Sequence, residues 1–464
     1  MRLAVIIPDG VGIRNFVLGK FLRTLPAHAE AHVFHSVASE ILPRLTNGIN
    51  GQVNWSTMLR FRPGRFTDVL QGSLAYAQMY WAHTTAMRRT LSLPVRGTWG
   101  RRCVQYTKRT IGRAAASPNR MRLLEHPVFH VTRRSPEAEW YRNAFRRIRP
   151  TALFCSQQLS LDAAPAIVAA KDLGIPTAAF IFSWDNLTSK GRVITSFDHY
   201  LVWSQYMKDE LLHYYPHVRA QSVHIVGTPQ FEPYVDSSLL LAREAFFSTL
   251  KADPSRPLIC YSGGDAGTAP EDPEHVRVLM DLIRSGRIQG QPQVVLRPVP
   301  VDDGKRYSQV LRDYPELIFS PPRWIHANNG EWSQFIPLPE DINLLANLTC
   351  HADLNVNLGS TMILDFGIHD KPVVNIGFDV ADPPVFGMPL YDFYYGYEHL
   401  QPVLELKATR VAKSVDQFAE HVNTYFGDPG LDREGRRRLV ELQVNKPIGQ
   451  STERLVKTLA SISS

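Results

Sequence analysis

Residues 354–368 read LNVNLGSTMILDFGI, and this stretch decides the fold class. The run 354–357 predicts a short buried strand, and a helical pattern begins at the Gly-Ser-Thr turn and continues over 361–368. A second apolar run at 373–376 predicts another strand. A strand, a helix and a further strand in this order are typical of a parallel sheet that is covered by helices.

The same alternation continues outward from this stretch in both directions. Further strands are predicted at 3–7, 31–37, 152–155, 177–182, 199–203, 223–226, 258–261 and 294–296. Helices are predicted at 15–25, 55–60, 67–89, 163–173, 205–214, 411–425, 432–443 and 451–462. A polar, Pro-rich break at 253–257 separates two similar halves. We therefore expect an α/β fold of two Rossmann-like domains, each with a doubly wound parallel sheet, that face each other across a cleft.

The sequence predicts that the chain has three parts. Residues 1–235 form an N-terminal Rossmann-like domain with an Arg-rich insertion at 88–149, and residues 236–430 form a C-terminal one. Residues 431–464 are expected to be helices that pack back toward the N-terminal domain.

The composition excludes several classes of protein. The 464 residues are 44% hydrophobic and 20% charged, which is typical of a globular chain and excludes wholesale disorder. No apolar run reaches the roughly 18–20 residues that span a bilayer, and the first apolar run is too short for a signal peptide. The four cysteines form no CxxC pair, so we expect reduced thiols, mostly in the core, and no zinc site. These features favour a cytoplasmic protein.

The insertion is strongly basic. Between Arg88 and Arg149 there are sixteen Lys or Arg residues, opposed only by Glu125, Glu137 and Glu139, while the whole chain has a formal net charge of +7. Nucleic acid, anionic lipid and a phosphate-bearing substrate all fit such a stretch. No nucleic-acid-binding motif accompanies it. We expect contact with the inner face of an anionic membrane and no nucleic-acid partner, and the alternative is a solvated basic face without a partner.

The loop after the first strand supplies the first candidate residues. Gly10 and Gly12 allow the backbone to approach a ligand closely, and Asp9 could act as a general base or only close a turn. The dinucleotide pattern GxGxxG needs glycine at position 15, which is Asn15, so a nicotinamide or flavin cofactor is not expected.

A second polar loop, 183–191, follows the predicted strand 177–182. Trp184 could stack on a sugar face, Asp185 could accept a proton, and Lys190 could meet a phosphate. Asn186 belongs to the same candidate substrate site. The alternative is that Asp185 and Asn186 only close an Asx-type turn.

The second half offers candidates for binding a diphosphate. Backbone N–H groups of a Gly-rich loop, Ser262-Gly263-Gly264, could face phosphate oxygens, and Arg297 at a strand end could fork onto them. Ser360 or Thr361 could cap a helix whose start binds an anion, with Asp365 near enough for ribose hydroxyls. Trp332 could stack on a nucleobase or belong to the core.

Several of these segments resemble a known superfamily. The stretches 183–191, VWS at 202–204, VGTPQF at 226–231 and 359–365 with KP at 371–372 resemble bacterial surface-carbohydrate enzymes of the GT-B glycosyltransferase superfamily. CDP-glycerol glycerophosphotransferase-like proteins of cell-wall and capsule assembly are among the most similar. The resemblance covers residues 150 to 380 and does not extend to the Arg-rich insertion.

The resemblance implies roles for the two halves. The C-terminal half would bind a nucleotide-activated donor, with the second-half residues named above holding its phosphates and ribose. The N-terminal half would bind the acceptor, with Asp9 or Asp185 as the base. Val299 stands where a glycerophosphotransferase is expected to have His, which favours a sugar donor.

The sequence therefore predicts a glycosyltransferase that moves a sugar from a nucleotide-sugar substrate to a surface-glycan or lipid-linked acceptor. No Asp-x-Asp motif lies at a suitable loop, so we expect the reaction to need no metal, and no other cofactor is expected. The alternatives are a CDP-glycerol-type glycerophosphotransferase or a nucleotide-sugar 2-epimerase on the same fold, and a non-catalytic GT-B-like scaffold.

Overall fold

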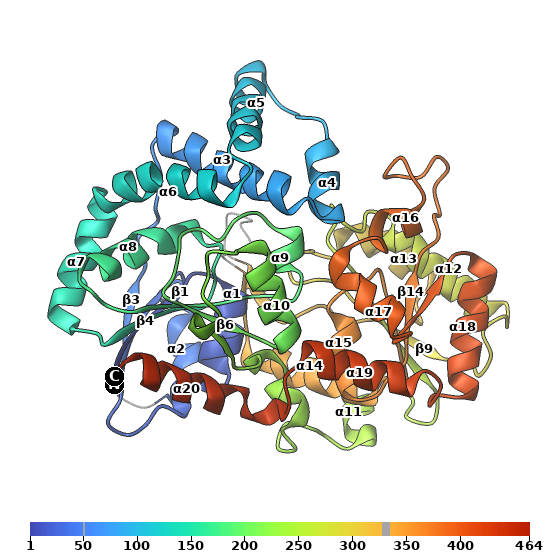
Figure 1. Cartoon of the computed structure of the whole chain (residues 1–464). Coiled ribbons are helices and arrows are strands. Elements are labelled where there is room, and N and C mark those ends of the chain that lie inside the picture. The colour runs from blue at the N-terminus through green and yellow to red at the C-terminus, as the bar shows by residue number, and fades with distance from the viewer. Residues whose placement is uncertain (50–51, 327–334) are drawn as a thin grey trace. The chain divides into compact units, whose positions relative to one another are not determined.

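The computed structural model describes residues 1–49, 52–326 and 335–464. They divide into two compact units (Figure 1). Unit 1 comprises Met1–Pro229 and Asn445–Ser464, and unit 2 comprises Gln230–Val444.

Unit 1 is built on a seven-stranded parallel sheet with the strand order β3-β2-β1-β4-β5-β6-β7. Strands β4 and β5 are buried at every position, as expected where helices cover both faces of a parallel sheet. The strand order reverses between β1 and β4, which pair directly. The strands are β1 (Arg2–Ile7), β2 (Glu30–His35), β3 (Val53–Thr57), β4 (Ala152–Cys155), β5 (Thr177–Phe180), β6 (His199–Val202) and β7 (Val223–Ile225).

Helices of unit 1 include most of the Arg-rich insertion. Two of them begin at a Ser-Pro pair: Ser117 and Ser135 each accept a hydrogen bond from a backbone N–H of the first turn, and proline follows each of them. The helices are α1 (Gly10–Gly12), α2 (Leu42–Thr46), α3 (Arg65–Ala82), α4 (Thr85–Ser92), α5 (Trp99–Ala114), α6 (Pro118–Arg133), α7 (Pro136–Ile148), α8 (Ala164–Asp172), α9 (Asn186–Ser189), α10 (Gln205–Tyr214) and α20 (Ser451–Ile462).

The last helix, α20, completes unit 1. Leu455 and Leu459 are fully buried, and α20 contacts β4. Arg454 Nε donates to the carbonyl oxygen of Val226 at 3.0 Å. A segment that follows unit 2 in the chain therefore supplies part of the core of unit 1.

Unit 2 is built on a six-stranded parallel sheet with the order β10-β9-β8-β13-β14-β15, which reverses between β8 and β13. A short antiparallel pair, β11 (Trp324–His326) and β12 (Phe335–Pro337), lies outside this sheet. The sheet strands are β8 (Leu258–Ser262), β9 (Gln293–Arg297), β10 (Ile318–Phe319), β13 (Leu354–Asn357), β14 (Val373–Ile376) and β15 (Arg410–Ala412). The helices are α11 (Arg243–Leu250), α12 (Asp272–Arg284), α13 (Ser308–Asp313), α14 (Pro339–His351), α15 (Met362–Ile368), α16 (Leu390–Tyr394), α17 (Gln401–Glu405), α18 (Val415–Gly427) and α19 (Arg433–Gln443).

The predicted α/β class with two doubly wound parallel sheets is confirmed, and some local predictions are wrong. Residues 55–60 were expected to be helical, but Val53–Thr57 forms the edge strand β3. Polar residues alternate in it with Val53, Trp55 and Thr57. Such β-branched and aromatic residues at alternate positions favour a strand. Within 15–25, a π-helix at Ile13–Leu18 and a 3₁₀ turn at Phe21–Arg23 replace one continuous helix.

The described helices and the cysteines bear on the expectations about membranes and thiols. No helix among the described residues is both long and apolar enough to cross a membrane. The four cysteines are free thiols, and Cys155 and Cys260 are buried in strands. Cys103, however, is exposed on α5 and does not belong to the core.

Two glycines at helix ends in unit 2 should respond oppositely to alanine. A Cβ at Gly435 in α19 would contact the carbonyl oxygen of Leu406 and lie 2.7 Å from that of Lys407, and neither backbone group can rotate away. Gly435→Ala should lower the free energy of unfolding by about 1–3 kcal/mol. Gly427→Ala, where a Cβ meets nothing within 4 Å, should leave it unchanged or raise it by up to about 1 kcal/mol. Denaturant unfolding of both variants measures this, and equal effects would contradict the packing described.

Candidate active site

Both sheets place polar residues where the strand order reverses. In doubly wound folds, ligands bind outside the carboxyl ends of the strands at such a reversal point. In unit 1 the point lies between β1 and β4, which are followed by Asp9 and Ser156. In unit 2 it lies between β8 and β13, which end at Ser262 and Asn357. Asp9 and Ser262, both named from the sequence, thus lie at reversal points.

The carboxyl edge of the second sheet ends in a polar row. Ser262 pairs in register with the last residue of β9 and the last residue of β13, and the latter pairs with a residue of β14. None of these four side chains is more than 6% exposed. We use the term polar row for these register partners, which are Arg297, Ser262, Asn357 and Asn375.

A ladder of amides connects the polar row. Asn355 Nδ2 donates to Ser262 Oγ at 2.8 Å, and Asn357 Nδ2 donates to Asn355 Oδ1 at 2.6 Å. Asn357 Oδ1 accepts from Asn375 Nδ2 at 2.9 Å and from the backbone N–H of Ser360 at 2.9 Å. The ladder therefore fixes the Gly-Ser-Thr turn as well as the strand ends.

Two buried atoms of the polar row have no hydrogen-bond partner among the described residues: Asn375 Oδ1 and Arg297 Nη1. The other terminal nitrogen of Arg297, Nη2, donates to both oxygens of Asp341 at 3.0 Å. Burial raises the pKa of Asp341, but the charge of Arg297 and donated hydrogen bonds bring it below its ordinary value. An unsatisfied buried donor and acceptor at a reversal point are suited to a polar ligand.

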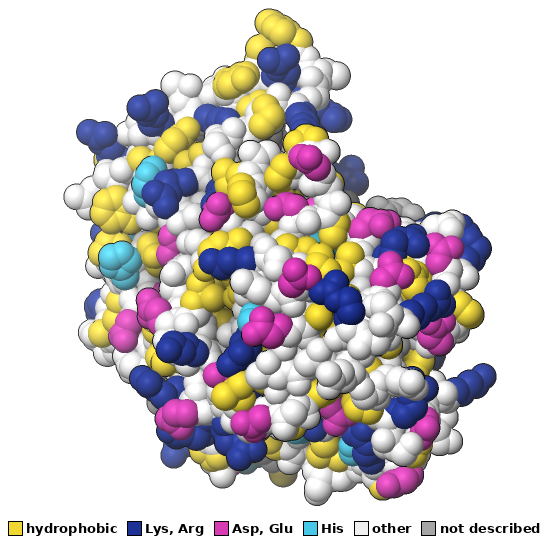
Figure 2. Space-filling model, turned by 90° about the vertical axis from the view of Figure 1, so that its right-hand side faces the viewer, with side chains coloured by type: hydrophobic (Ala, Val, Ile, Leu, Met, Phe, Trp, Pro, Cys, Tyr) yellow, Lys and Arg dark blue, Asp and Glu magenta, His cyan; other side chains and the backbone are white. Residues whose placement is uncertain are grey.

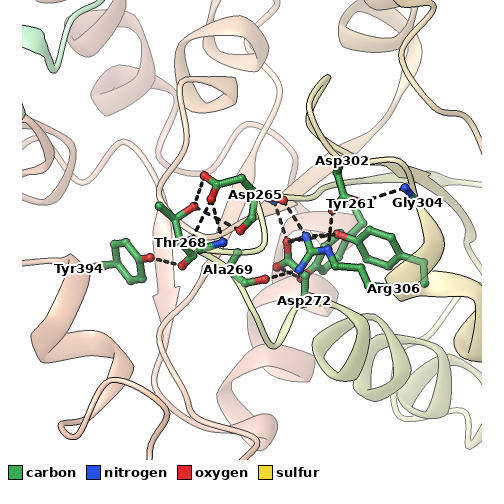
Figure 3. A network of polar contacts seen from close by, with 12 residues as sticks. Tyr261, Asp265, Thr268, Ala269, Asp272, Asp302, Gly304, Arg306 and Tyr394 are labelled. Carbon is green, nitrogen blue, oxygen red and sulfur yellow. Dashed lines mark hydrogen bonds and ion pairs between the residues drawn. The ribbon is translucent and has the colours of Figure 1, made fainter. Parts of the chain in front are cut away.

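A network of polar side chains holds the Gly-rich loop of unit 2 in place (Figure 3). Gly264 N donates to Asp272 Oδ2 at 2.7 Å, and Arg306 Nη2 donates to the carbonyl oxygen of Gly264 at 2.6 Å. Gly263 N donates to the carbonyl oxygen of Arg297 at 2.9 Å. Both glycine N–H groups are therefore used within the protein. This does not favour the prediction that they face phosphate oxygens, although the loop itself lies beside the polar row.

Asp272 is the centre of this network. Tyr261 Oη donates to its Oδ1 at 2.8 Å, and Arg306 pairs with its Oδ2 at 3.3 Å. Burial raises the pKa of Asp272 to about 6, although hydrogen bonds from Tyr261 and Gly264 and the charge of Arg306 oppose the shift. Further along the loop, Asp265 accepts from the N–H groups of Gly267 and Thr268. The loop shape is thus set by two carboxylates.

The remaining candidates of unit 2 differ in accessibility. Asp365 is 3% exposed, and its Oδ1 accepts a hydrogen bond from Tyr234 Oη. A ribose hydroxyl that binds Asp365 Oδ1 would therefore share this oxygen with the phenol of Tyr234. Ser360 Oγ accepts from the backbone N–H of Met362 at 3.1 Å, and Thr361 precedes α15. Trp332 lies outside the described residues.

In unit 1, Asp9 caps the short helix α1. Its Oδ1 accepts from Gly12 N at 2.7 Å. Burial raises its pKa above the ordinary value, although hydrogen bonds, including that from Gly12, oppose this. Gly10 and Gly12 are buried, and a Cβ at position 12 would lie 2.6 Å from Ser156 Oγ, so only glycine fits. Ser156 Oγ is itself buried without a hydrogen-bond partner among the described residues.

The loop 183–191 is more self-contained. Asp185 accepts from Ser183 Oγ at 2.6 Å and from Ser189 Oγ at 2.7 Å, so both carboxylate oxygens are used in its own turn. Trp184 is only 3% exposed, which does not favour stacking on a sugar. Asn186 is also buried and accepts from Gln158 Nε2 at 2.9 Å, while Lys190 is exposed. Gln158 belongs to the loop that follows β4, so its bond to Asn186 ties the loop 183–191 to the reversal point of the first sheet.

Sequence reasoning missed several residues that build these edges. Asn355 and Asn375 had a usable signal, because amides inside short strands that are otherwise apolar must find buried partners. The partners of the loop and of Arg297 had no such signal, since they lie on other elements, 8, 42 and 44 positions along the chain. These residues are Asp272, Arg306 and Asp341.

Comparison with known proteins concerns the fold. No protein-family model matches the sequence, and no curated protein matches it. Solved structures match over nearly the whole chain. The UDP-GlcNAc 2-epimerase of Neisseria meningitidis, bound to UDP-GlcNAc, has a TM-score of 0.52 at 9% identity, covering 99% of this chain and 100% of that one. A glycosyltransferase of Rickettsia africae has a TM-score of 0.52 at 9% identity, covering 99% and 98%.

The wall teichoic acid polymerase TagF also matches, with a TM-score of 0.51 at 8% identity, covering 100% of this chain and 88% of that one. The chain has the GT-B fold. Identities this low carry the likeness no further than the fold. Within this GT-B fold, the polar row and Asp9 lie at the strand-order reversals of their respective sheets.

The raised pKa of Asp272 predicts a stability effect with a definite sign. The folded chain binds this proton more tightly than the unfolded chain, whose pKa is near 3.8. The stability that wild type gains from Asp272 is therefore largest below about pH 4 and decreases as the pH rises to about 6. The difference in unfolding free energy between wild type and Asp272→Asn should shrink by about 2–3 kcal/mol between pH 4 and 7. Denaturant titrations across this range test the sign, and a difference that grows with pH would refute it.

Proposed function

We propose that the chain is a glycosyltransferase that moves a sugar from a nucleotide-activated donor to a surface-glycan or lipid-linked acceptor. The observation that carries the proposal is the polar row, in which Arg297 Nη1 and Asn375 Oδ1 find no hydrogen-bond partner within residues 1–49, 52–326 and 335–464. A guanidinium suits the diphosphate of a nucleotide sugar, and an amide oxygen suits a hydroxyl or ring N–H. UDP-GlcNAc is the ligand of one solved structure with the same fold, which supports this class of donor.

In the proposed mechanism, an acceptor hydroxyl attacks the anomeric carbon of the bound nucleotide sugar. Asp9 takes the proton of this hydroxyl, and the bond from the sugar to the diphosphate breaks. Arg297 stabilises the negative charge that develops on the departing diphosphate. Asp9 is preferred to Asp185 as the base because burial raises the pKa of Asp9 toward neutrality, although hydrogen bonds from Gly12, Gln157 and Val11 oppose this shift. The proposed reaction needs no metal.

The alternative functions differ in their substrates. A nucleotide-sugar 2-epimerase would convert the donor without any acceptor, and a glycerophosphotransferase would select CDP-glycerol. Fold neighbours of both kinds exist. Val299 continues to favour a sugar donor. A scaffold would bind nucleotide weakly or not at all, and its role would survive Asp9→Asn.

Donor binding should depend on the Gly-Ser-Thr turn and on Arg297. Ser360→Ala and Thr361→Ala should each weaken binding of the preferred nucleotide, and Arg297→Lys should weaken it by about 10–150-fold, since a charge-assisted fork is lost. Lysine is chosen because alanine would leave Asp341 buried without its ion pair. Thermal-shift screening with UDP, CDP, GDP, dTDP and CMP identifies the nucleotide, and titration calorimetry measures the affinities.

Arg284→Lys is the matched control, because this arginine pairs with Glu316 on the surface of unit 2. It should leave the nucleotide affinity unchanged. If Ser360→Ala, Thr361→Ala and Arg297→Lys all bind the nucleotide as tightly as wild type, the donor does not bind at the polar row and the adjoining turn.

Catalysis should depend on the ionised form of Asp9. Asp9→Asn should lower kcat by about 100- to 10,000-fold with the nucleotide affinity retained. In wild type, the acid limb of the kcat/KM profile should lie above 3.8, the ordinary pKa of this carboxyl, because burial raises it. Asp185→Asn is the comparison variant and should lose far less activity. A larger loss in Asp185→Asn than in Asp9→Asn would reverse the assignment of the base.

A further inference from the structure

The N-terminal half of α5 carries large, exposed apolar side chains. Trp99 is 82% exposed and Tyr106 50%, and Leu93, just before the helix, is 57% exposed. In Figure 1, α5 rises from α3 at the top of unit 1, and in Figure 2 hydrophobic and Lys or Arg side chains share that region. We define residues 93–106 as the α5 tip.

The tip lies within a stretch without acidic residues. From residue 69 to residue 124 there is no Asp or Glu, and there are ten basic residues: Arg88, Arg89, Arg96, Arg101, Arg102, Lys108, Arg109, Arg113, Arg120 and Arg122. The acids that border the stretch are already paired. Asp68 pairs with Lys108 at 2.8 Å and Glu125 with Arg192 at 2.6 Å. The tip therefore presents positive charge around exposed apolar groups.

The other half of α5 is firmly attached. Lys108 and Gly112 are its buried residues, and a Cβ at Gly112 would lie 2.6 Å from Tyr76 Cβ on α3. Helix α5 therefore packs closely on α3 at its C-terminal half and extends beyond the unit at its N-terminal half. This rigid base means that the tip needs no folding transition to bind.

We propose that the α5 tip docks unit 1 on the surface of an anionic phospholipid bilayer. Trp99 and Leu93 enter the boundary between headgroups and acyl chains, and Arg96, Arg101 and Arg102 contact lipid phosphates. Exposed aromatic and aliphatic side chains among arginines are typical of segments that bind at the membrane interface. A second copy of the tip would repel the first, and a nucleic-acid groove offers little to an aliphatic side chain such as Leu93. The surface is outside the reversal points, so the inference does not depend on the proposed function.

Vesicle flotation tests the docking. The full chain should float with vesicles of phosphatidylcholine and phosphatidylglycerol, should not float with phosphatidylcholine alone, and should be released by salt. Trp99→Ser should reduce the partition constant by about tenfold, and the double variant Arg101→Glu/Arg102→Glu by about 10–100-fold. Arg438→Glu/Lys457→Glu, at two exposed basic residues outside the tip, is the matched control with the same change of charge and should float like wild type. All these side chains are exposed, so the variants should keep the wild-type Tm.

Cys103 allows the contact itself to be located. It is the exposed cysteine of the tip, and Cys350→Ser removes the next most accessible thiol. An NBD fluorophore on Cys103 should shift to shorter wavelength on anionic vesicles and be quenched by lipids that carry a nitroxide on the acyl chain. Flotation with an unshifted probe would overturn the assignment of the tip. The proposal would also be overturned by equal binding to neutral vesicles, by binding to nucleic acid but not to vesicles, or by a dimer that Trp99→Ser dissociates.

A nucleotide screen separates this inference from the proposed function. Trp99→Ser should retain the thermal shift of wild type with every nucleotide, because α5 and the polar row belong to different units. If Trp99→Ser loses flotation and retains nucleotide binding, the tip binds the membrane independently of the donor site. If Trp99→Ser loses both, the inference that the two sites are independent is wrong.

Discussion

Asn357 must satisfy its amide at a place from which water is excluded. A buried polar group without a hydrogen-bond partner typically costs about 1–3 kcal/mol of folding free energy. The neighbouring groups are therefore constrained to supply its partners. Its nitrogen donates to Asn355, and its oxygen accepts from Asn375 and from the start of the Gly-Ser-Thr turn. These bonds keep β8, β13 and β14 in register at their carboxyl ends. The arrangement of the candidate donor site depends on them.

The two units build their reversal points differently. In unit 1 the backbone itself comes close, since Gly12 leaves room for Ser156 and Asp9 caps the short helix beside it. In unit 2 the strand ends carry buried polar side chains, including the guanidinium of Arg297, and the loop next to them is fixed by the ion pair of Asp272 and Arg306. A site made by backbone approach suits a small hydroxyl-bearing group, and a site with a guanidinium suits a charged one. This asymmetry agrees with an acceptor in unit 1 and a nucleotide donor in unit 2.

The sequence predicted the periodic parts of the molecule well. Apolar strands separated by helices predict a doubly wound sheet, and residues at strand ends, such as Ser262 and Arg297, fall at the reversal edge because parallel strands share that edge. What could not be predicted depends on long-range partners. The pairing of Arg297 with Asp341, 44 positions along the chain, and the burial of Trp184 follow from packing that no local pattern records. The edge strand at Val53–Thr57 differs from the predicted helix because an alternation of only five residues is too short to separate the two by pattern.

The discontinuity of unit 1 has a consequence for biosynthesis. Unit 2 is one continuous segment, so all of it leaves the ribosome before α20 does. Unit 1, although its larger part precedes unit 2, lacks Leu455 and Leu459 from its core until α20 is made. Domains generally fold as units during synthesis, but here unit 1 begins before unit 2 in the chain and is completed after it. During that interval, the surface of unit 1 that α20 covers, including β4 and the carbonyl of Val226, is open to chaperones.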